Sequence, residues 1–301
     1  MTDQKITLRA NAKINLFLDI TGKRPDGYHT ISGVMHAVGL WDDVTVALSP
    51  RAEGEDAIRL TCSRPDLPTD RGNLGYRAAE AFLQAIGKGT DAEFGVYIHI
   101  EKRIPAAAGL AGGSTDAAAV LRGLNLLLGQ PLCVEELCRV GLTLGADVPF
   151  CIVGGTQMTC GVGEELTPVR SLPACSMVIA CGGEGVSTPG AYRALDQLFE
   201  DFDGRLYRPR EEGLARLIQG LEREDMEEIS NSVYNIFEYV VLPRHSVALP
   251  IKRIMEEHGA RVALMSGSGP SVFGIFFNPE AAESAAKALA ERDVPAWICQ
   301  N

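Results

Sequence analysis

Aliphatic and polar side chains alternate along several short segments of the chain, beginning with INLFLDI at 14–20. Such alternation is typical of a half-buried strand. Other segments repeat their apolar residues every three or four positions, as an amphipathic helix does. In the first half, strands are predicted over 14–20, 44–48, 57–62 and 96–102, and helices over 73–86, 115–129 and 134–145.

The second half has a different order of elements. Strands are predicted over 177–180, 261–265, 271–277 and 295–300, and helices over 189–199, 211–220, 224–240, 246–258 and 280–291. This order favours an α+β domain with an antiparallel sheet and helices on one face. Glycines and prolines interrupt the pattern between 160 and 174. We therefore predict two domains, residues 1–160 and 161–301.

Composition narrows the class of protein. The 301 residues are 46% hydrophobic and 22% charged, with a formal net charge of −11. An acidic chain of this kind is a poor match for nucleic acid, whose phosphates select basic surfaces. No run of 18 apolar residues is present and the first twenty residues lack the pattern of a signal peptide, so we expect a cytoplasmic protein that does not bind membranes.

The eight cysteines form no C-x-x-C pair and several lie in apolar stretches, as in PFCIVGG at 149–155. Structural zinc sites draw their ligands from closely spaced pairs. Buried, reduced thiols are the expectation for such cysteines inside the cell.

One segment carries a clear signal for chemistry. In 105-PAAAGLAGGSTDAAA-119, every residue except Leu110 and Asp116 is Pro, Ala, Gly, Ser or Thr, and the segment lies between a predicted strand and a predicted helix. Small residues let the backbone approach a ligand, and the first turn of a helix offers unpaired N–H groups to an anion. We expect Ser114 or Thr115 to cap the helix and one of their hydroxyls to reach a phosphate-bound Mg²⁺.

The segment matches neither of the best known phosphate-binding patterns. G-x-x-x-x-G-K-[ST] is absent, and no G-x-G-x-x-G follows the strand. The alternative is a glycine-rich turn that only lets strand and helix pack closely. Because the small residues are so concentrated, an anion-binding loop is the favoured interpretation.

Three segments together resemble the GHMP kinases. They are AKINL at 12–16, the small-residue loop at 105–119 and MSGSGPSVFG at 265–274, in the order that this family shows. The resemblance covers nearly the whole chain. It implies an α+β, two-domain GHMP kinase architecture, with an N-terminal domain like ribosomal protein S5 domain 2 and a ferredoxin-like C-terminal domain. It also implies a small-molecule kinase that uses ATP and Mg²⁺.

PDGYH at 25–29 points to one branch of the family, because the wider family does not share this turn. The branch phosphorylates the 2-hydroxyl of a sugar alcohol linked to a cytidine diphosphate group. That reaction serves the non-mevalonate route to isopentenyl diphosphate. The resemblance therefore implies a small-molecule acceptor that carries a cytidine diphosphate group.

Lys13 and Asp147 match the catalytic positions of the family. The resemblance places them together, where Asp147 accepts or orients the acceptor hydroxyl and Lys13 stabilises the charge of the transferred phosphoryl group. Asn15 lies two residues after Lys13, on the same face of a strand, and is expected to bind substrate. Without the resemblance, Lys13 is a charge on a solvent face and Asp147 a solvated residue at a helix end, before Pro149 ends regular structure.

The predicted substrate-binding residues also include Tyr28 and His29, for which ordinary surface turn residues are the alternative. The resemblance implies that Tyr28 stacks on the cytosine and His29 hydrogen-bonds its edge. Tyr192 is expected to cover the second face of the base, and Thr188 to help hold the ligand.

The predicted ATP-binding residues come from four parts of the chain. They are Asn73, Lys102, Pro105, Ala106, Ala107, Ala108, Gly109, Leu110, Ala111, Gly112, Gly113, Ser114, Thr115, Gly267 and Gly269. For Lys102, an exposed charge at a strand end is the alternative. Asp116 suits a helix start but repels phosphate, so we interpret it as a cap or an indirect Mg²⁺ contact. Gly267 and Gly269 predict a tight turn that closes the active site.

Two further functions remain open on the sequence. A mevalonate, phosphomevalonate or homoserine kinase, or the related decarboxylase, lacks the Asp-Gly-Tyr-His turn. A catalytically silent nucleotide-binding protein on the same fold is the other alternative, since fold does not fix function. The protein is expected to be a monomer or homodimer.

Overall fold

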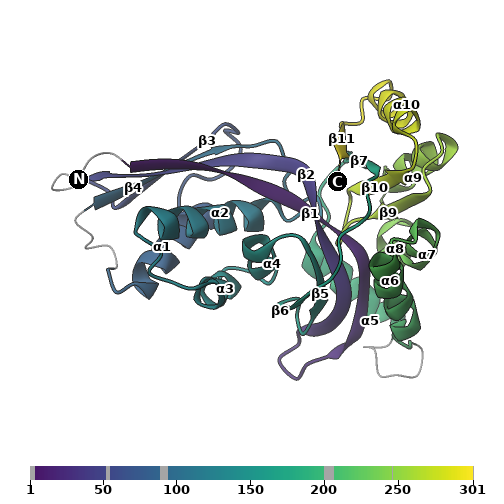
Figure 1. The fold of residues 1–301 in the computed structure, drawn as a ribbon, viewed down its shortest axis with the longest axis horizontal. Helices are drawn as coiled ribbons and strands as arrows, with labels where there is room; N and C mark the ends of the chain where they lie inside the picture. Colours follow the sequence, from purple (N-terminus) through teal and green to yellow (C-terminus); the bar gives the residue numbers. More distant parts are fainter. Residues whose placement is uncertain (1–3, 52–54, 89–93, 200–206, 246, 301) are drawn as a thin grey trace. The chain divides into compact units, whose positions relative to one another are not determined.

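The computed structural model describes residues 4–51, 55–88, 94–199, 207–245 and 247–300 (Figure 1). The chain divides into two compact units, each assembled from several segments. Unit 1 comprises residues 1–12, 40–104 and 111–154, and unit 2 comprises 13–39, 105–110 and 155–301. We predicted one boundary at residue 160, with a single continuous segment on each side of it. That boundary stays a prediction.

Two long strands of a mixed sheet run from one unit into the other, β1 (Gln4–Lys23) and β2 (His29–Pro50). They extend well beyond the strands predicted at 14–20 and 44–48. The half-buried character predicted for 14–20 is wrong, because residues 12 to 20 are all buried. The polar positions of the alternation face protein groups instead of solvent. Asp19, for example, accepts a hydrogen bond from the backbone N–H of Arg210 at 2.7 Å.

Unit 1 is a sheet covered by helices. β3 (Ile58–Cys62) pairs parallel with β4 (Phe94–Glu101), which pairs antiparallel with residues 43–50 of β2. The helices α1 (Leu74–Ala85), α2 (Gly112–Leu127), α3 (Val134–Leu142) and α4 (Val148–Val153) lie on one face of this sheet (Figure 1). Apolar residues of β2, β4, α1 and α2 form one continuous core, which includes Val46, Ile98, Phe82 and Leu121.

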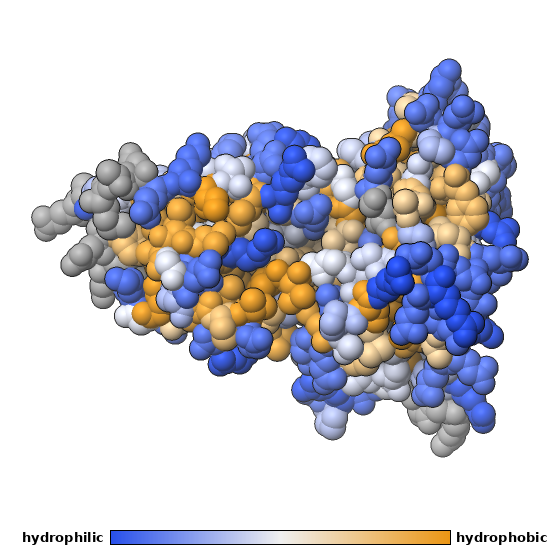
Figure 2. Space-filling model, in the orientation of Figure 1, coloured by the Kyte–Doolittle hydropathy of each residue, from blue (hydrophilic) through white to orange (hydrophobic). Residues whose placement is uncertain are grey.

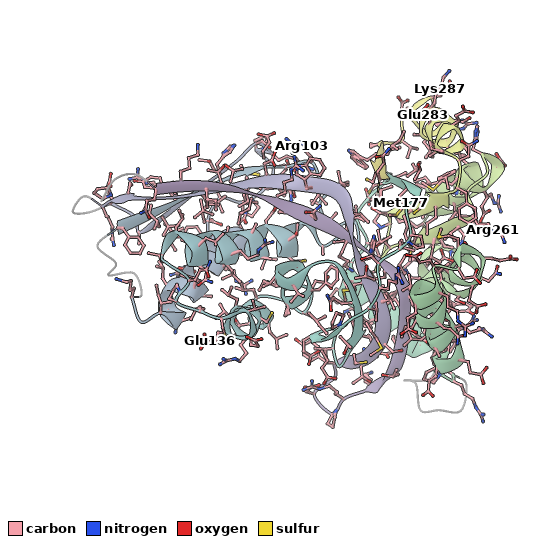
Figure 3. The ribbon with its side chains drawn as sticks, in the orientation of Figure 1. Arg103, Glu136, Met177, Arg261, Glu283 and Lys287 are labelled. Carbon is pink, nitrogen blue, oxygen red and sulfur yellow. The ribbon has the colours of Figure 1, made fainter. Side chains whose placement is uncertain are left out.

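Part of unit 2 is the antiparallel sheet expected for the second half. Its order is β11 (Ala296–Gln300), β7 (Ser176–Ala180), β10 (Val272–Phe276) and β9 (Val262–Met265). Helices α9 (Ala248–Glu257) and α10 (Pro279–Ala290) pack on it. α10 turns Ala285 and Leu289 inward while Glu283 and Lys287 point to solvent, and Met177 of β7 is fully buried (Figure 3).

The remaining elements of unit 2 are β5 (Thr156–Cys160), β6 (Glu165–Pro168), α5 (Thr188–Phe199), α6 (Glu211–Arg223), α7 (Met226–Ser232), β8 (Tyr234–Asn235) and α8 (Glu238–Val241). The single helix predicted over 224–240 is therefore wrong. Asp225 caps α7, the chain extends at Val233 with ψ 145°, and β8 pairs parallel with Phe17 and Leu18 of β1. Strand pairing with β1 overrides the local helical spacing.

Figure 2 shows hydrophobic residues at the surface over the helices of unit 1. The large exposed apolar side chains of these helices are Leu126 of α2, Val134 and Leu142 of α3, and Val153 of α4. Within the residues that the structure describes, no helix is both long and apolar enough to cross a bilayer.

Candidate functional site

The first half of the small-residue loop, residues 105–110, belongs to unit 2 and packs against the turn between β9 and β10. Ser266 Oγ donates to the carbonyl of Gly109 at 3.0 Å, and Ser271 N donates to the carbonyl of Ala108 at 3.3 Å. Gly267 and Gly269 have φ of +56° and +81°, which confirms a tight turn here. A Cβ on Gly109 would lie 2.1 Å from the carbonyl oxygen of Ser266. The loop and the turn therefore meet backbone to backbone.

The second half of the loop belongs to unit 1 and starts α2 at Gly112, three residues before the predicted start. Ala111 occupies the N-cap position with φ +58°, and no side chain caps the helix. The expected capping by Ser114 or Thr115 is therefore wrong. The hydroxyl of Thr115 donates instead to the carbonyl of Asn11 in β1 at 2.7 Å. Without a cap, the first N–H groups of α2 keep their capacity to bind an anion.

Lys102 lies just after β4 and its side chain is buried, which rules out the alternative of an exposed strand-end charge. Its Nζ is 2.5 Å from Asp42 Oδ2 and 2.8 Å from Asp116 Oδ2. For Asp116 we predicted a cap or an indirect Mg²⁺ contact, and nothing in the sequence indicated this ion pair. Burial raises the pKa of Asp116 to about 7, against the opposing effect of Lys102. Burial also disfavours the Lys102 ammonium, but the two carboxylates outweigh it and raise the pKa of Lys102.

Lys13 is buried within β1 in unit 2 and does not sit on a solvent face. Its Nζ donates to Asn15 Oδ1 at 2.7 Å, which confirms that the two side chains share a face. The backbone N–H of Lys13 donates to the carbonyl of Leu110 at 3.2 Å. Lys13 is thus anchored next to the first half of the loop, where a cation suits phosphate.

Asp147 stands at the N-cap position of α4 in unit 1 and is half-buried. Its side chain does not cap the helix. Pro149 lies in the first turn of α4, so the expectation that it ends regular structure is wrong. Proline is tolerated at a helix start because the N–H that it lacks has no partner there in any case.

His29, Tyr192 and Asp196 form one group in unit 2. His29 Nε2 lies 2.6 Å from Asp196 Oδ1, and Lys23 Nζ lies 2.9 Å from Asp196 Oδ2. The His29 ring stacks on Tyr192 with centroids 4.8 Å apart, and Tyr192 packs edge-on against Phe237. His29 is therefore a buried, oriented side chain and not an ordinary surface turn residue.

The other predicted binding residues differ in how they are held. Tyr28 is 66% exposed, so its ring is open to a ligand. Thr188 begins α5, and its Oγ1 is 2.8 Å from Ser268 Oγ in the turn between β9 and β10. Asn73 caps α1 in unit 1 by accepting from Gly75 N, and it also donates to the carbonyl of Pro68.

Asp42 and Asp196 were missed by the sequence analysis. Asp196 stands four residues after Tyr192 on α5, one helical turn away, and this spacing is a signal that was available. Asp42 lies two residues before Val44, in phase with the buried face of the strand predicted at 44–48, and this alternation is a signal that could have placed its side chain inside.

We expect Asp196→Asn to destabilise the protein in a pH-dependent way. Burial acts to raise the pKa of Asp196, but hydrogen bonds from Lys23 and His29 outweigh it and lower the pKa. Because folding lowers the pKa of Asp196, its carboxylate stabilises the fold at pH values above the unfolded pKa of about 4. This stabilisation is lost as the pH falls below about 4 and passes through the folded pKa. The variant should lose about 1 kcal/mol of unfolding free energy at pH 7.

Urea unfolding at several pH values measures this difference. The wild-type and variant curves should converge as the pH falls below about 4. A difference that stays constant from pH 7 to pH 3 would show that the carboxylate charge is not its source.

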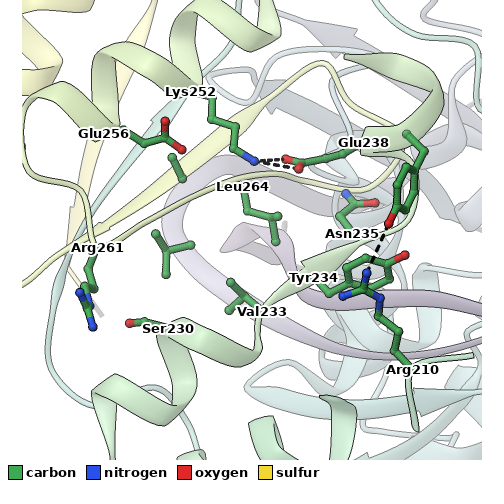
Figure 4. Close-up of a pocket in the computed structure, with 13 residues that line it drawn as sticks. Arg210, Ser230, Val233, Tyr234, Asn235, Glu238, Lys252, Glu256, Arg261 and Leu264 are labelled. Carbon is green, nitrogen blue, oxygen red and sulfur yellow. Dashed lines mark hydrogen bonds and ion pairs between the residues drawn. The ribbon is translucent and has the colours of Figure 1, made fainter. Parts of the chain in front are cut away.

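A groove of about 570 Å³ lies elsewhere in unit 2, among α7, β8, α8, α9 and β9 (Figure 4). None of the residues predicted from the sequence lines it. Lys252 Nζ pairs with both carboxylate oxygens of Glu238, and Arg210 donates to the hydroxyl of Tyr239. The Lys252–Glu238 pair supports the fold around β9, since Glu238 also accepts from Met265 N at 3.0 Å.

Comparisons with known proteins agree with the family resemblance. The model of the GHMP kinase N-terminal domain matches residues 73–155, and that of the C-terminal domain matches residues 217–294. The 4-diphosphocytidyl-2-C-methyl-D-erythritol kinase of Caldicellulosiruptor saccharolyticus is 43% identical over 98% of this chain and 97% of its own. The protein of the same name from a Synechococcus strain is 44% identical over 99% of this chain and 94% of its own.

Solved structures show the same relationship. A crystal structure of a 4-(cytidine 5'-diphospho)-2C-methyl-D-erythritol kinase is 33% identical, with a TM-score of 0.75 and 98% of both chains covered. A homoserine kinase from Cytophaga hutchinsonii, 20% identical, has a TM-score of 0.73 over 99% of this chain and 94% of its own. The second likeness concerns the fold alone.

Proposed function

Because this chain belongs to the 4-diphosphocytidyl-2-C-methyl-D-erythritol kinases, within the GHMP kinases, we propose that it transfers the γ-phosphoryl group of ATP to the 2-hydroxyl of 4-diphosphocytidyl-2-C-methyl-D-erythritol. The reaction belongs to the non-mevalonate route to isopentenyl diphosphate. The observation that carries the proposal is 43% identity over nearly the full length of a kinase of that name.

ATP is proposed to bind along the loop at 105–119. The uncapped start of α2 supports this, because its N–H groups and its partial positive charge attract phosphate. Mg²⁺, bound with ATP, supplies charge neutralisation at the phosphates. Hard cations take oxygen ligands, which fits the hydroxyl of Ser114, and the Thr115 hydroxyl already donates to Asn11. We therefore favour Ser114 over Thr115 as the protein's Mg²⁺ contact.

Lys13 and Asp147 are proposed as the catalytic pair. Phosphoryl transfer requires positioning and charge stabilisation more than covalent chemistry. The burial of Lys13 strengthens its electrostatic effect, because a charge acts more strongly away from water. In this proposal Asp147 accepts or orients the hydroxyl proton of the acceptor while Lys13 stabilises charge on the transferred group. Asn15 accepts a hydrogen bond from Lys13 and holds the ammonium in place, and we propose that it also contacts the substrate.

The cytidine end of the acceptor is proposed to lie at Tyr28, His29 and Tyr192. Tyr28 offers an exposed ring for stacking, and the contact with Asp196 fixes the orientation of the His29 ring. Thr188 and the turn at Gly267 and Gly269 are hydrogen-bonded neighbours within the same unit, which supports their place in ligand binding.

We expect Tyr28→Ala to weaken acceptor binding without loss of stability. The side chain is 66% exposed, so its removal costs little folding energy, whereas stacking on a base contributes ~1–3 kcal/mol. The KM for the cytidine-linked acceptor should rise about tenfold, with the KM for ATP unchanged. Tyr28→Phe is the matched control and should keep the wild-type KM. Equal KM values for the Ala variant and the wild type would remove Tyr28 from the base site.

A panel of acceptors tests the proposed activity. Purified protein with ATP and Mg²⁺ should phosphorylate the cytidine-linked methylerythritol and leave mevalonate, phosphomevalonate and homoserine unmodified. Turnover of one of the latter three alone would assign a different kinase. No turnover of any acceptor, with ATP still bound, would support a catalytically silent nucleotide-binding protein.

A further inference from the structure

A buried charge cluster lies beside the small-residue loop, entirely within unit 1. The Lys102 ammonium sits between Asp42 Oδ2 at 2.5 Å and Asp116 Oδ2 at 2.8 Å. The three side chains are 4%, 0% and 5% exposed, respectively. Burial of three charges is costly unless each has partners in good geometry. The cluster holds two carboxyl groups and one ammonium, so the ammonium is what allows both carboxyl groups to be ionised side by side.

Asp42 fixes the chain where it enters the loop. Its second oxygen, Oδ1, accepts from the backbone N–H groups of Arg103 at 2.5 Å and Ile104 at 2.9 Å. These residues follow β4 and immediately precede Pro105. One carboxylate thus binds both the ammonium and two consecutive backbone donors. The chain direction at the start of the loop is therefore set by Asp42.

Asp116 fixes the chain where it leaves the loop, on the second turn of α2. Thr115 anchors the same turn through its hydrogen bond to Asn11. Gly112, at the start of α2, lies directly against the cluster, because a Cβ there would be 3.3 Å from Lys102 Nζ and 3.0 Å from Ile104 Cγ2. The start of the helix and the entry to the loop are thus joined through a single ammonium.

We propose that Asp42, Lys102 and Asp116 form a positioning brace that holds both ends of the loop at 105–119 and so sets the spacing of the N–H groups that receive the ATP phosphates. This rests on the proposed use of the loop for ATP. Lys102 acts through its two carboxylates and is a positioning residue. Two of its three donors are already taken by Asp42 and Asp116.

Binding of ATP alone, measured by calorimetry without acceptor, tests the brace. Lys102→Met should raise the Kd for ATP about tenfold or more, since Asp42 and Asp116 then lose the cation that links them and cannot both stay ionised. The double variant Lys102→Met with Asp116→Asn should recover a large part of that loss, because the amide that replaces the Asp116 carboxylate can donate a hydrogen bond to Asp42 and link the two ends again. Asp43→Asn is the matched control, as Asp43 is the neighbour of Asp42 and pairs with the exposed Arg103. It should bind ATP like the wild type.

The outcomes separate the brace from direct contact. If Lys102 binds ATP itself, the double variant will bind as weakly as Lys102→Met, which would overturn the proposal. A Lys102→Met variant that binds ATP as tightly as Asp43→Asn would overturn it too. Should Lys102→Met fail to fold, Asp42→Asn decides instead: the brace requires a raised ATP Kd with an unchanged KM for acceptor. An acceptor other than the proposed one would leave these ATP measurements unaffected.

Discussion

Asp147→Asn should lower kcat by about 10³-fold while both substrates still bind, because a positioned acid or base contributes about 10²- to 10⁴-fold to a rate. Asparagine preserves the size of the side chain and can still accept a hydrogen bond, but it does not take up a proton. The KM for the acceptor should therefore change little. Steady-state kinetics, together with calorimetric titration of acceptor and ATP analogue, separates the loss of chemistry from a loss of binding.

The matched control is Asp225→Asn. Asp225 also stands at a helix N-cap, that of α7, and asparagine caps helices about as well as aspartate. The kcat of the Asp225→Asn variant should equal that of the wild type. An Asp147→Asn variant with a near-normal kcat would remove Asp147 from the chemistry and leave Lys13 and the loop to account for the rate.

Gly109→Ala should strongly destabilise unit 2 and abolish ATP binding. Gly109 has φ +76°, and an alanine Cβ would lie 2.1 Å from the carbonyl oxygen of Ser266. The left-handed backbone alone costs about 1–2 kcal/mol for a residue with a Cβ. The Cβ is fixed to the backbone of the loop and meets the backbone of the turn, so neither group can rotate away and the loop and the turn must separate. We expect a total loss of about 3 kcal/mol of unfolding free energy.

Gly129→Ala measures the cost of the left-handed backbone without a steric clash. Gly129 has φ +79°, and a Cβ there meets no atom within 4 Å. It should lose only about 1–2 kcal/mol and keep its ATP affinity. Urea unfolding and ATP titration of the two variants give the comparison. Equal stability losses would show that the contact between the loop and the Ser266 turn is not rigid.

Much of the fold was predictable where local pattern and tertiary structure agree. α1 and α10 have apolar residues at helical spacing and were found within a residue or two. The error at 224–240 came from β8, whose two residues are extended because they pair with β1, more than two hundred positions away. Nothing within a window of a few residues contains that information. The length of β1 and β2 was missed for the same reason.

Site residues were predictable where a sequence motif indicates their chemistry. They were not predictable where their role depends on burial and on partners from distant segments. Glycines and alanines mark the loop, and Lys13 and Asn15 share a strand face by simple alternation. Lys102 was misjudged as a possible exposed charge because its two partners come from β2 and α2. For Asp42 the strand alternation, and for Asp196 the helical spacing from Tyr192, indicate a position and no chemistry. Their importance arises only from the partners that the fold brings to them.

Phosphorus NMR of the product of ATP and 4-diphosphocytidyl-2-C-methyl-D-erythritol tests the central claim most directly. One new monophosphate-ester resonance is expected, from a phosphate on the oxygen of the 2-hydroxyl. The diphosphate should stay intact, and one ADP should form for each phosphate transferred. Release of inorganic phosphate alone, or a phosphate on any other hydroxyl, would contradict it.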